Sequence, residues 1–161
     1  MEQTKIHPFN NNIETGLRIL AILNASFPKS FDLQTLLYLD YLTVHSGDMI
    51  DGIESLHPAV PSRKGEIFVR RTIINEGLDL LVSKGLIVKH YEKDGIKYSA
   101  SESSTPFIES LSEEYFLKLY QKANWVIGQL IQIPPEELAS FMTKFMVQLD
   151  NNFILDIKHH E

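Results

Sequence analysis

The chain has 161 residues, of which 43% are hydrophobic and 22% are charged, a composition that is ordinary for a globular domain. Its length suits one domain with a core of its own. It contains no cysteine, which excludes a disulfide framework and metal sites with thiolate ligands. No apolar run approaches the roughly 20 residues that cross a membrane, and no signal peptide opens the chain. We therefore expect a cytoplasmic protein that does not contact membranes.

The formal net charge of −6 is distributed unevenly along the chain. Residues 1–61 carry 3 basic and 7 acidic side chains, and residues 99–161 carry 4 and 9. The stretch between them, 62–98, carries 8 basic and 5 acidic side chains. This basic region in an acidic chain permits a local contact with an anion, but it does not predict a broad surface for duplex DNA.

The N-terminal part predicts a polar arm followed by two helices. Residues 1–12 include three consecutive asparagines, and we expect them to form a flexible arm. A helix is predicted over 13–27, with Asn12 as its N-cap. A second helix is predicted over 32–46, with Asp32 as its N-cap and a wide apolar face.

The stretch 47–68 has no clean hydrophobic period and contains three glycines and two prolines. Connections of about this length are uncommon in compact domains and are often functional. Near it lie two imidazoles and two carboxylates, His45, Asp48, Asp51 and His57, the ligand types of many hydrolytic metal sites. Their spacing matches no metal motif, and Asp in such loops more often forms turns, so a metal-dependent hydrolase is the least favoured interpretation.

The stretch from Val69 to Ala100 predicts a helix followed at once by a β-hairpin. Apolar residues recur at three- and four-residue spacings up to Val82, which is typical of an amphipathic helix. Gly85 follows, where a left-handed C-cap is wanted. Alternating side chains then predict two strands around Asp94-Gly95, with both turn residues expected at positive φ.

A helix that leads directly into a two-stranded ribbon is typical of the second half of a winged helix. The fold class predicted is therefore mainly α with a small β-hairpin, a winged-helix domain over 13–100 with a long loop at 47–68. The third helix is expected to be able to start as early as Pro61 or Ser62.

A C-terminal helical extension over 101–150 is expected to pack on this domain, followed by a tail at 151–161. Thr105-Pro106 predicts the entry of a short helix, and Ser112 is expected to cap the next helix. That helix and a last one from about Glu136 to Asp150 show apolar stripes with helical spacing. The first stripe consists of Phe116, Leu119, Tyr120, Ala123, Val126, Ile127 and Leu130.

Basic side chains gather at the start of the third predicted helix, beside the long connection. Arg63, Lys64, Arg70 and Arg71, together with His57 in the connection, form a candidate contact with a partner protein or a phosphate. The alternative is an ordinary solvated helix face.

Trp125 is the only tryptophan, and it falls on the side of its helix opposite the apolar stripe, among lysines and glutamines. An aromatic residue on a polar face suggests a contact with another chain. The alternative is that the hairpin or the last helix covers it within the same chain.

The stretch from Leu39 to Ile127 resembles the middle component of bacterial ABC-three-component systems. The residues that carry the resemblance are Leu56-His57-Pro58, Pro61, Arg63, Gly65-Glu66, Val69-Arg70-Arg71, Gly77-Leu78, Gly85-Leu86, Gly95-Ile96, Pro106-Phe107 and Trp125.

The resemblance implies a role in anti-phage defence of the Lamassu type. Such a middle component looks like the small winged-helix subunits of SMC complexes. It would dock on an SMC-like ABC ATPase and couple DNA sensing to an effector such as a nuclease, reaching DNA through the complex. The resemblance supplies no catalytic residue, and we expect neither an enzyme nor a bound cofactor.

The main competing interpretation is a winged-helix transcription regulator that binds DNA by itself. It would place Ile73 to Lys84 of the third helix in the major groove, with Lys84 among the few base-reading side chains, and Lys93 or Lys97 on the phosphates. Against it, that helix offers few base-reading side chains and carries Glu76 and Asp79.

Overall fold

The computed structural model describes residues 11–48, 54–56, 63–134, 136–145 and 147–148, so the predicted arm and tail lie almost wholly outside the described residues. The described part is mainly helical, with one antiparallel β-hairpin, as predicted. Its elements are α1 (Asn12–Ala25), α2 (Leu33–Val44), the short 3-10 helix η1 (Ser46–Asp48), α3 (Arg63–Ser83), β1 (Ile87–Glu92), β2 (Gly95–Ala100), α4 (Ser104–Glu109) and α5 (Glu114–Leu130). Residues 136–145 form a further helix.

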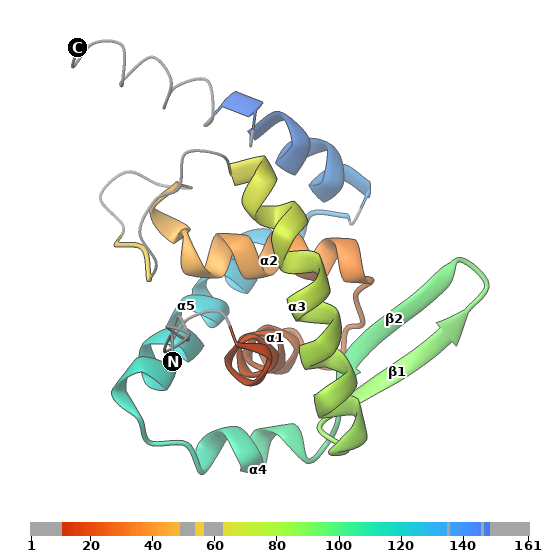
Figure 1. Ribbon diagram of the computed structural model, residues 1–161, viewed down its shortest axis with the longest axis vertical. Coiled ribbons are helices and arrows are strands. Elements are labelled where there is room, and N and C mark those ends of the chain that lie inside the picture. The colour runs from red at the N-terminus through yellow and green to blue at the C-terminus, as the bar shows by residue number, and fades with distance from the viewer. Residues whose placement is uncertain (1–10, 49–53, 57–62, 135, 146, 149–161) are drawn as a thin grey trace, which may run out of the picture.

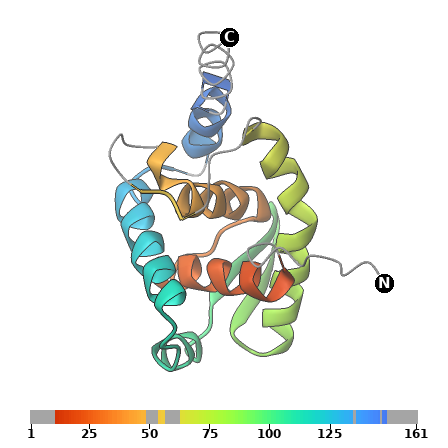
Figure 2. The ribbon, with the colours of Figure 1, turned by 60° about the vertical axis from the view of Figure 1, so that its left-hand side comes forward.

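Helix α1 lies at the centre of the fold, between α3 on one side and α5 on the other (Figures 1 and 2). Helix α2 packs against both α3 and α5, and α4 closes the fold beside α1. Most of α1 is therefore buried, including the continuous run from Arg18 to Leu23. Side chains of α1 thus belong to one hydrophobic core shared with the other helices and the hairpin.

Two glycines allow α1 and α3 to approach each other closely. A Cβ atom added at Gly77 would lie 2.9 Å from the backbone nitrogen of Gly16 and 2.9 Å from the carbonyl oxygen of Asn12. Backbone atoms cannot move aside as side chains do. The α1–α3 contact therefore requires glycine at this crossing.

The helix ends follow the expected capping chemistry with one shift of register. Asn11, and not Asn12 as predicted, caps α1, since its side-chain oxygen accepts a hydrogen bond from the backbone N–H of Glu14 at 2.7 Å. Asp32 caps α2 as predicted, accepting from Thr35 N–H at 2.8 Å. Gly85 has a φ of +73° and ends α3 in a Schellman motif, which confirms the predicted left-handed C-cap.

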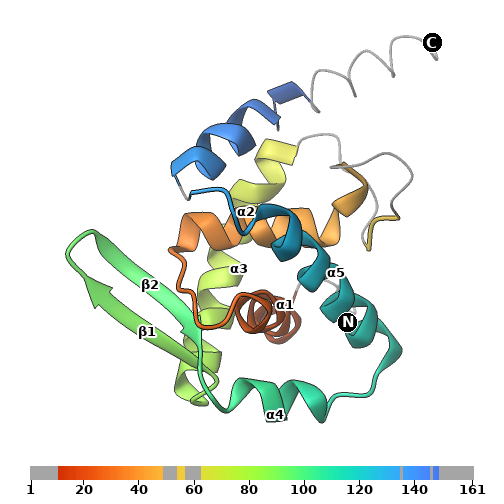
Figure 3. The ribbon, with the colours of Figure 1, turned by 180° about the vertical axis from the view of Figure 1, so that it is seen from behind.

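The hairpin pairs Glu92 with Gly95, so Lys93 and Asp94 are the two turn residues. Only Gly95 has a positive φ there, +129°, so the prediction that Asp94 also adopts a positive φ is wrong. The base of the hairpin is anchored by Tyr98, whose backbone exchanges two hydrogen bonds with Phe31, between α1 and α2. From this anchor the ribbon extends away from the helices (Figure 3).

Helix α5 confirms its predicted stripe, but the predicted caps are wrong. Six residues of the α5 stripe are buried, and the seventh, Tyr120, is half-buried. In the last helix, Leu138 and Met142 are buried, whereas Phe141 of the predicted stripe is 43% exposed. Glu113 and not Ser112 occupies the N-cap of α5. Thr105 lies inside α4, where its hydroxyl donates to the side-chain oxygen of Asn24 instead of capping the helix. The Thr105 prediction failed because the partner of its hydroxyl, Asn24, lies 81 residues away in the sequence.

The last part of the stretch 47–68, predicted as a loop, belongs to helix α3. Helix α3 begins at Arg63, close to the early start expected at Pro61 or Ser62. Between η1 and α3 only residues 54–56 are described. None of the helices in the described ranges is long and apolar enough to cross a membrane.

Candidate functional site

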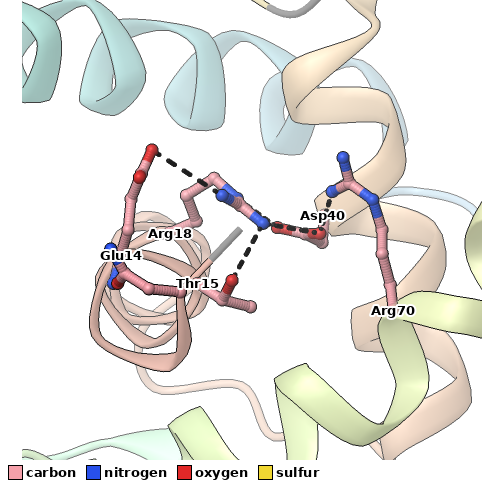
Figure 4. Close-up of polar contacts among 6 residues, drawn as sticks. Glu14, Thr15, Arg18, Asp40 and Arg70 are labelled. Carbon is pink, nitrogen blue, oxygen red and sulfur yellow. Dashed lines mark hydrogen bonds and ion pairs between the residues drawn. The ribbon is translucent and has the colours of Figure 1, made fainter. Parts of the chain in front are cut away.

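A cluster of charged side chains lies in the interior where α1, α2 and α3 meet (Figure 4). Arg18 of α1 and Arg70 of α3 both bond to the carboxylate of Asp40, on α2. The Arg18 Nε donates to Asp40 Oδ1 at 2.8 Å, and the Arg70 Nη1 donates to Asp40 Oδ2 at 2.6 Å. Their exposed fractions are 1% for Arg18, 0% for Asp40 and 5% for Arg70. One carboxylate thus connects three helices.

The two guanidinium groups keep Asp40 ionised. Burial by itself would raise the pKa of the Asp40 carboxyl, but the charges and hydrogen bonds of Arg18 and Arg70 outweigh burial and lower this pKa below its ordinary value. Burial opposes the charge on Arg18 as well, and attraction to Asp40 more than compensates, so the pKa of Arg18 is raised. The cluster is therefore charged inside the protein at neutral pH.

Side chains of α1 and α5 surround this cluster. The Arg18 Nη2 donates to the hydroxyl of Thr15 at 3.3 Å, and its Nη1 lies 3.9 Å from the carboxylate of Glu14. Burial raises the pKa of Glu14, although a hydrogen bond with Tyr115 and the charge of Arg18 act in the opposite direction. The pKa of the Tyr115 phenol is raised too, by burial and by the nearby Glu14 charge. With Glu14, the interior holds two cations and two carboxylates.

The burial of Arg70 requires a correction of the sequence-based site. The sequence predicted Arg70 as a surface contact for a partner or a phosphate, but its guanidinium is enclosed and bonded to Asp40. Arg71, one residue further and about 100° around the helix, is exposed and donates to the side-chain oxygen of Gln34 at 3.1 Å. The side chains of Arg63 and Lys64, and all of His57, lie outside the described residues. Of the four basic residues predicted to contact a partner, Arg71 is thus the one whose described side chain is exposed.

Trp125 lines a groove on the outer side of α5 instead of standing alone on a polar face. It is half-buried, packs against the core, and shares a cavity of about 540 Å³ with Leu56 and Tyr115. Lys122, also in the groove, donates its Nζ to the carbonyl oxygen of Glu54 at 2.5 Å. Among the described residues, the segment at 54–56 lies beside Trp125 in this groove, and a contact of Trp125 with another chain stays a prediction.

The three lysines predicted to reach DNA differ in their surroundings. Lys97 is held in the hairpin by Glu92 at 3.1 Å and by Asp94 at 3.3 Å. Hydrogen bonds with these two carboxylates raise the pKa of Lys97, and the bond with Lys97 lowers the pKa of Asp94. Lys84 and Lys93 are exposed and form no ion pair within the described part of the chain. The charge of Lys97 is therefore already neutralised by its own hairpin.

The candidate metal ligands are only partly described. His45 is buried at the end of α2 with its ring centroid 4.7 Å from that of Tyr41, as a packed core residue would be. The side chain of Asp48, and all of Asp51 and His57, lie outside the described residues. Over the ranges that the structure does describe, no three His, Cys, Asp or Glu side chains gather to hold a metal ion.

The charged interior was missed in the sequence, although one signal pointed to it. Asp40 is the only charged residue of α2, and such a residue must find a partner when its helix is buried. Arg18 likewise interrupts the apolar side of α1. What the sequence did not reveal is that Arg70, 30 positions further along the chain, completes the cluster.

Comparison with known proteins agrees with the resemblance described above. No curated protein and no solved structure matches the chain. Residues 8–152 match the family model described as ABC-three component (ABC-3C) system Middle Component 2. This match covers both the helical core and the hairpin, and a component of such a system works with partner proteins. The chain therefore belongs to the Middle Component 2 family of ABC-three component systems.

Proposed function

We propose that this protein is a non-catalytic, winged-helix subunit that docks on an SMC-like ABC ATPase in a Lamassu-like anti-phage defence complex. In that complex it couples the sensing of DNA to an effector such as a nuclease, and it reaches DNA through its partners. Family membership supports a role in an ABC-three component defence system. The division of labour within that system is our inference.

The winged-helix assignment is supported by the order and pairing of the elements. Three helices precede the hairpin, and Phe31, between the first two, pairs with β2 as a minimal third strand. This sequence of elements, helix, short strand, two helices and ribbon, is the order expected for a winged helix. Helix α5 adds to the same core by packing on α1 and α2.

The observation that favours protein docking over autonomous DNA binding is the charge of the surface that would face a duplex. The exposed side of α3 carries Glu76 and Asp79. In the hairpin, Lys97 is neutralised by two carboxylates. A duplex attracts proteins that bring uncompensated cations to its phosphates. Lys84 and Lys93 are such cations, but the carboxylates of Glu76 and Asp79 stand on the helix that would enter the groove and oppose them. This surface fits a protein partner better than a duplex.

Co-expression with the genomic neighbours tests this proposal. The tagged chain should co-purify with a coiled-coil ABC ATPase, and size-exclusion mass should give a single complex. Purified alone, it should not shift a random DNA duplex at physiological salt. Recovery of a lone homodimer that shifts DNA would contradict the proposal and favour the transcription regulator.

A charge reversal at Arg71 localises the contact. Because Arg70 is buried on Asp40, reversing it would disrupt the core and say nothing about docking. Arg71→Glu should weaken co-purification, whereas Lys144→Glu, an equal charge change at an exposed site of the helix at 136–145, should not. Equal recovery of the ATPase with both variants would remove Arg71 from the interface.

A further inference from the structure

The two-stranded hairpin has an outer edge whose backbone groups bond to no other residue in the described part of the chain. In the β1–β2 register, Lys89 faces Tyr98 and Tyr91 faces Ile96. Tyr98 uses its backbone N–H and C=O to bond Phe31, on the side away from β1. Since residues at a wide pair both point these groups outward, the N–H and C=O of Lys89 and Tyr91 point away from β2, along the free side of β1.

This edge lies open to solvent and carries large apolar side chains. The ribbon extends away from the helices in views from opposite sides (Figures 1 and 3). On β1, Tyr91 is 77% exposed and Val88 is 41% exposed, and Ile96 on the neighbouring β2 is 40% exposed. Tyr91 and Ile96 lie opposite each other at the far end of the hairpin. An unpaired strand with exposed apolar side chains is the kind of edge that accepts a further strand.

The charges around this edge are cationic. Glu92 and Asp94 are both engaged by Lys97. Lys89 extends its ammonium over the ring of Tyr91, 5.6 Å from the ring centroid, and Lys93 is exposed in the turn. Neither lysine has a carboxylate partner within the described ranges. A strand that carries acidic side chains would complement them, whereas a second copy of β1 would bring further lysines.

We propose that β1 takes up an extended, acidic and apolar segment of another component of the ABC-three component system as a third strand of the sheet. The backbone of that segment bonds to the N–H and C=O of Lys89 and Tyr91. Its apolar side chains pack on Tyr91, and its carboxylates meet Lys89 and Lys93. This inference rests on the proposed function, because a partner of the same system supplies the strand.

Amide hydrogen exchange on the co-expressed complex tests the pairing directly. In the free chain, the amides of Lys89 and Tyr91 should exchange quickly, since no described residue accepts a hydrogen bond from them. In the complex with the ATPase and its neighbours, both should become protected by at least about tenfold, the scale of one added hydrogen bond. The amide of Ile96, on the opposite edge, should exchange at the same rate in both states.

Proline substitutions separate the contribution of the backbone N–H to partner binding from that of the side chain. Lys89→Pro removes an outward N–H and leaves the β1–β2 ladder intact, so it should weaken binding about tenfold more than Lys89→Ala does. Ile96→Pro removes the corresponding N–H on the other edge and should behave like an alanine substitution there. Circular dichroism of each variant confirms that the hairpin still forms.

The outcomes distinguish this inference from the proposed function. If the wild-type chain recovers no partner, both the proposed function and the strand inference are wrong. If the complex forms but the amides of Lys89 and Tyr91 stay unprotected, the strand inference alone is wrong. If these amides become protected in the isolated chain together with a doubling of its mass, the occupant is a second copy and the inference is overturned.

Discussion

The protein contains two clusters in which one central charge pairs with two opposite charges, and the two clusters differ in their surroundings. In the interior, Arg18 and Arg70 share the carboxylate of Asp40. In the hairpin, Glu92 and Asp94 share the ammonium of Lys97. The interior contacts measure 2.8 and 2.6 Å and the hairpin contacts 3.1 and 3.3 Å. The interior group is excluded from water, and the hairpin group is not.

The surroundings of an ion pair, more than its contact distance, decide how much it contributes to stability. An exposed pair exchanges hydration for a screened attraction and contributes little. A buried pair has already lost its hydration, so removing one partner leaves a charge with neither water nor counter-ion. The interior cluster is therefore a point on which α1, α2 and α3 depend together, and the hairpin cluster mainly sets a local charge.

The largest effect is expected for Asp40→Ala, which leaves Arg18 and Arg70 buried without their counter-ion. We expect the free energy of unfolding to fall by about 3–5 kcal/mol, as measured by urea denaturation. The control is Asp94→Ala in the hairpin, which should leave the urea midpoint unchanged. Equal losses in the two variants would contradict the distinction between the two clusters.

Should Asp40→Ala prevent folding altogether, a triple variant sharpens the same comparison. Replacing Asp40 by Leu together with Arg18→Met and Arg70→Met removes every charge of the cluster and retains apolar volume. Such replacements are often neutral or stabilising. Recovery of a folded protein with near wild-type stability would show that the unpaired charges, and not lost volume, cause the damage.

The same carboxylate predicts how stability depends on pH. The folded-state pKa of Asp40 is lowered from its ordinary value of 3.8, so its contribution is fully present above that pH and is lost as the pH falls through the folded-state pKa. The gap in the free energy of unfolding between wild type and Asp40→Asn should therefore close below pH 3.8.

Glu14 acts in the opposite direction and in a different pH window. Its pKa is raised above 4.5, so its protonation on folding adds stability as the pH falls towards that value. Urea midpoints of wild type and Asp40→Asn, measured between pH 7 and pH 2.5, separate the two groups. A gap that stays constant through this range would contradict the assignment to Asp40.

A smaller loss is expected where α1 and α3 approach most closely, at the glycine pair beside the charged cluster. Gly77→Ala places a methyl group against the backbone of Gly16. The two helices must separate, which should cost about 1–3 kcal/mol. Gly128→Ala in α5 meets no atom within 4 Å and should be neutral or stabilising by up to about 1 kcal/mol. Thermal unfolding of both variants measures the difference, and a stable Gly77→Ala protein would show that the helices can move apart freely.

The smallest effect is expected in the hairpin cluster. Lys97→Ala removes both ion pairs of a partly exposed side chain, and attraction there is screened by water and salt. The melting temperature should not change measurably, at low or at high salt. A clear drop that disappears with added salt would show that the hairpin cluster matters to stability after all.

The sequence by itself determined the local features of this protein. The apolar periods located the helices, Asp32 and Gly85 marked a start and an end, and alternation marked both strands. These features depend on neighbours within a few residues, so short stretches of the sequence are enough to predict them. The family resemblance likewise rests on residues that can be read in order.

Only the tertiary structure decided which charges are buried and which edge stays open. Arg70 and Arg71 are neighbours in the sequence, yet one closes a buried cluster and the other reaches solvent. Their difference depends on Asp40, which is 30 residues away from Arg70. In the same way, the free edge of β1 follows from the pairing of Tyr98 with distant Phe31. Burial and pairing arise between segments far apart in the chain, and the local pattern of either segment does not contain them.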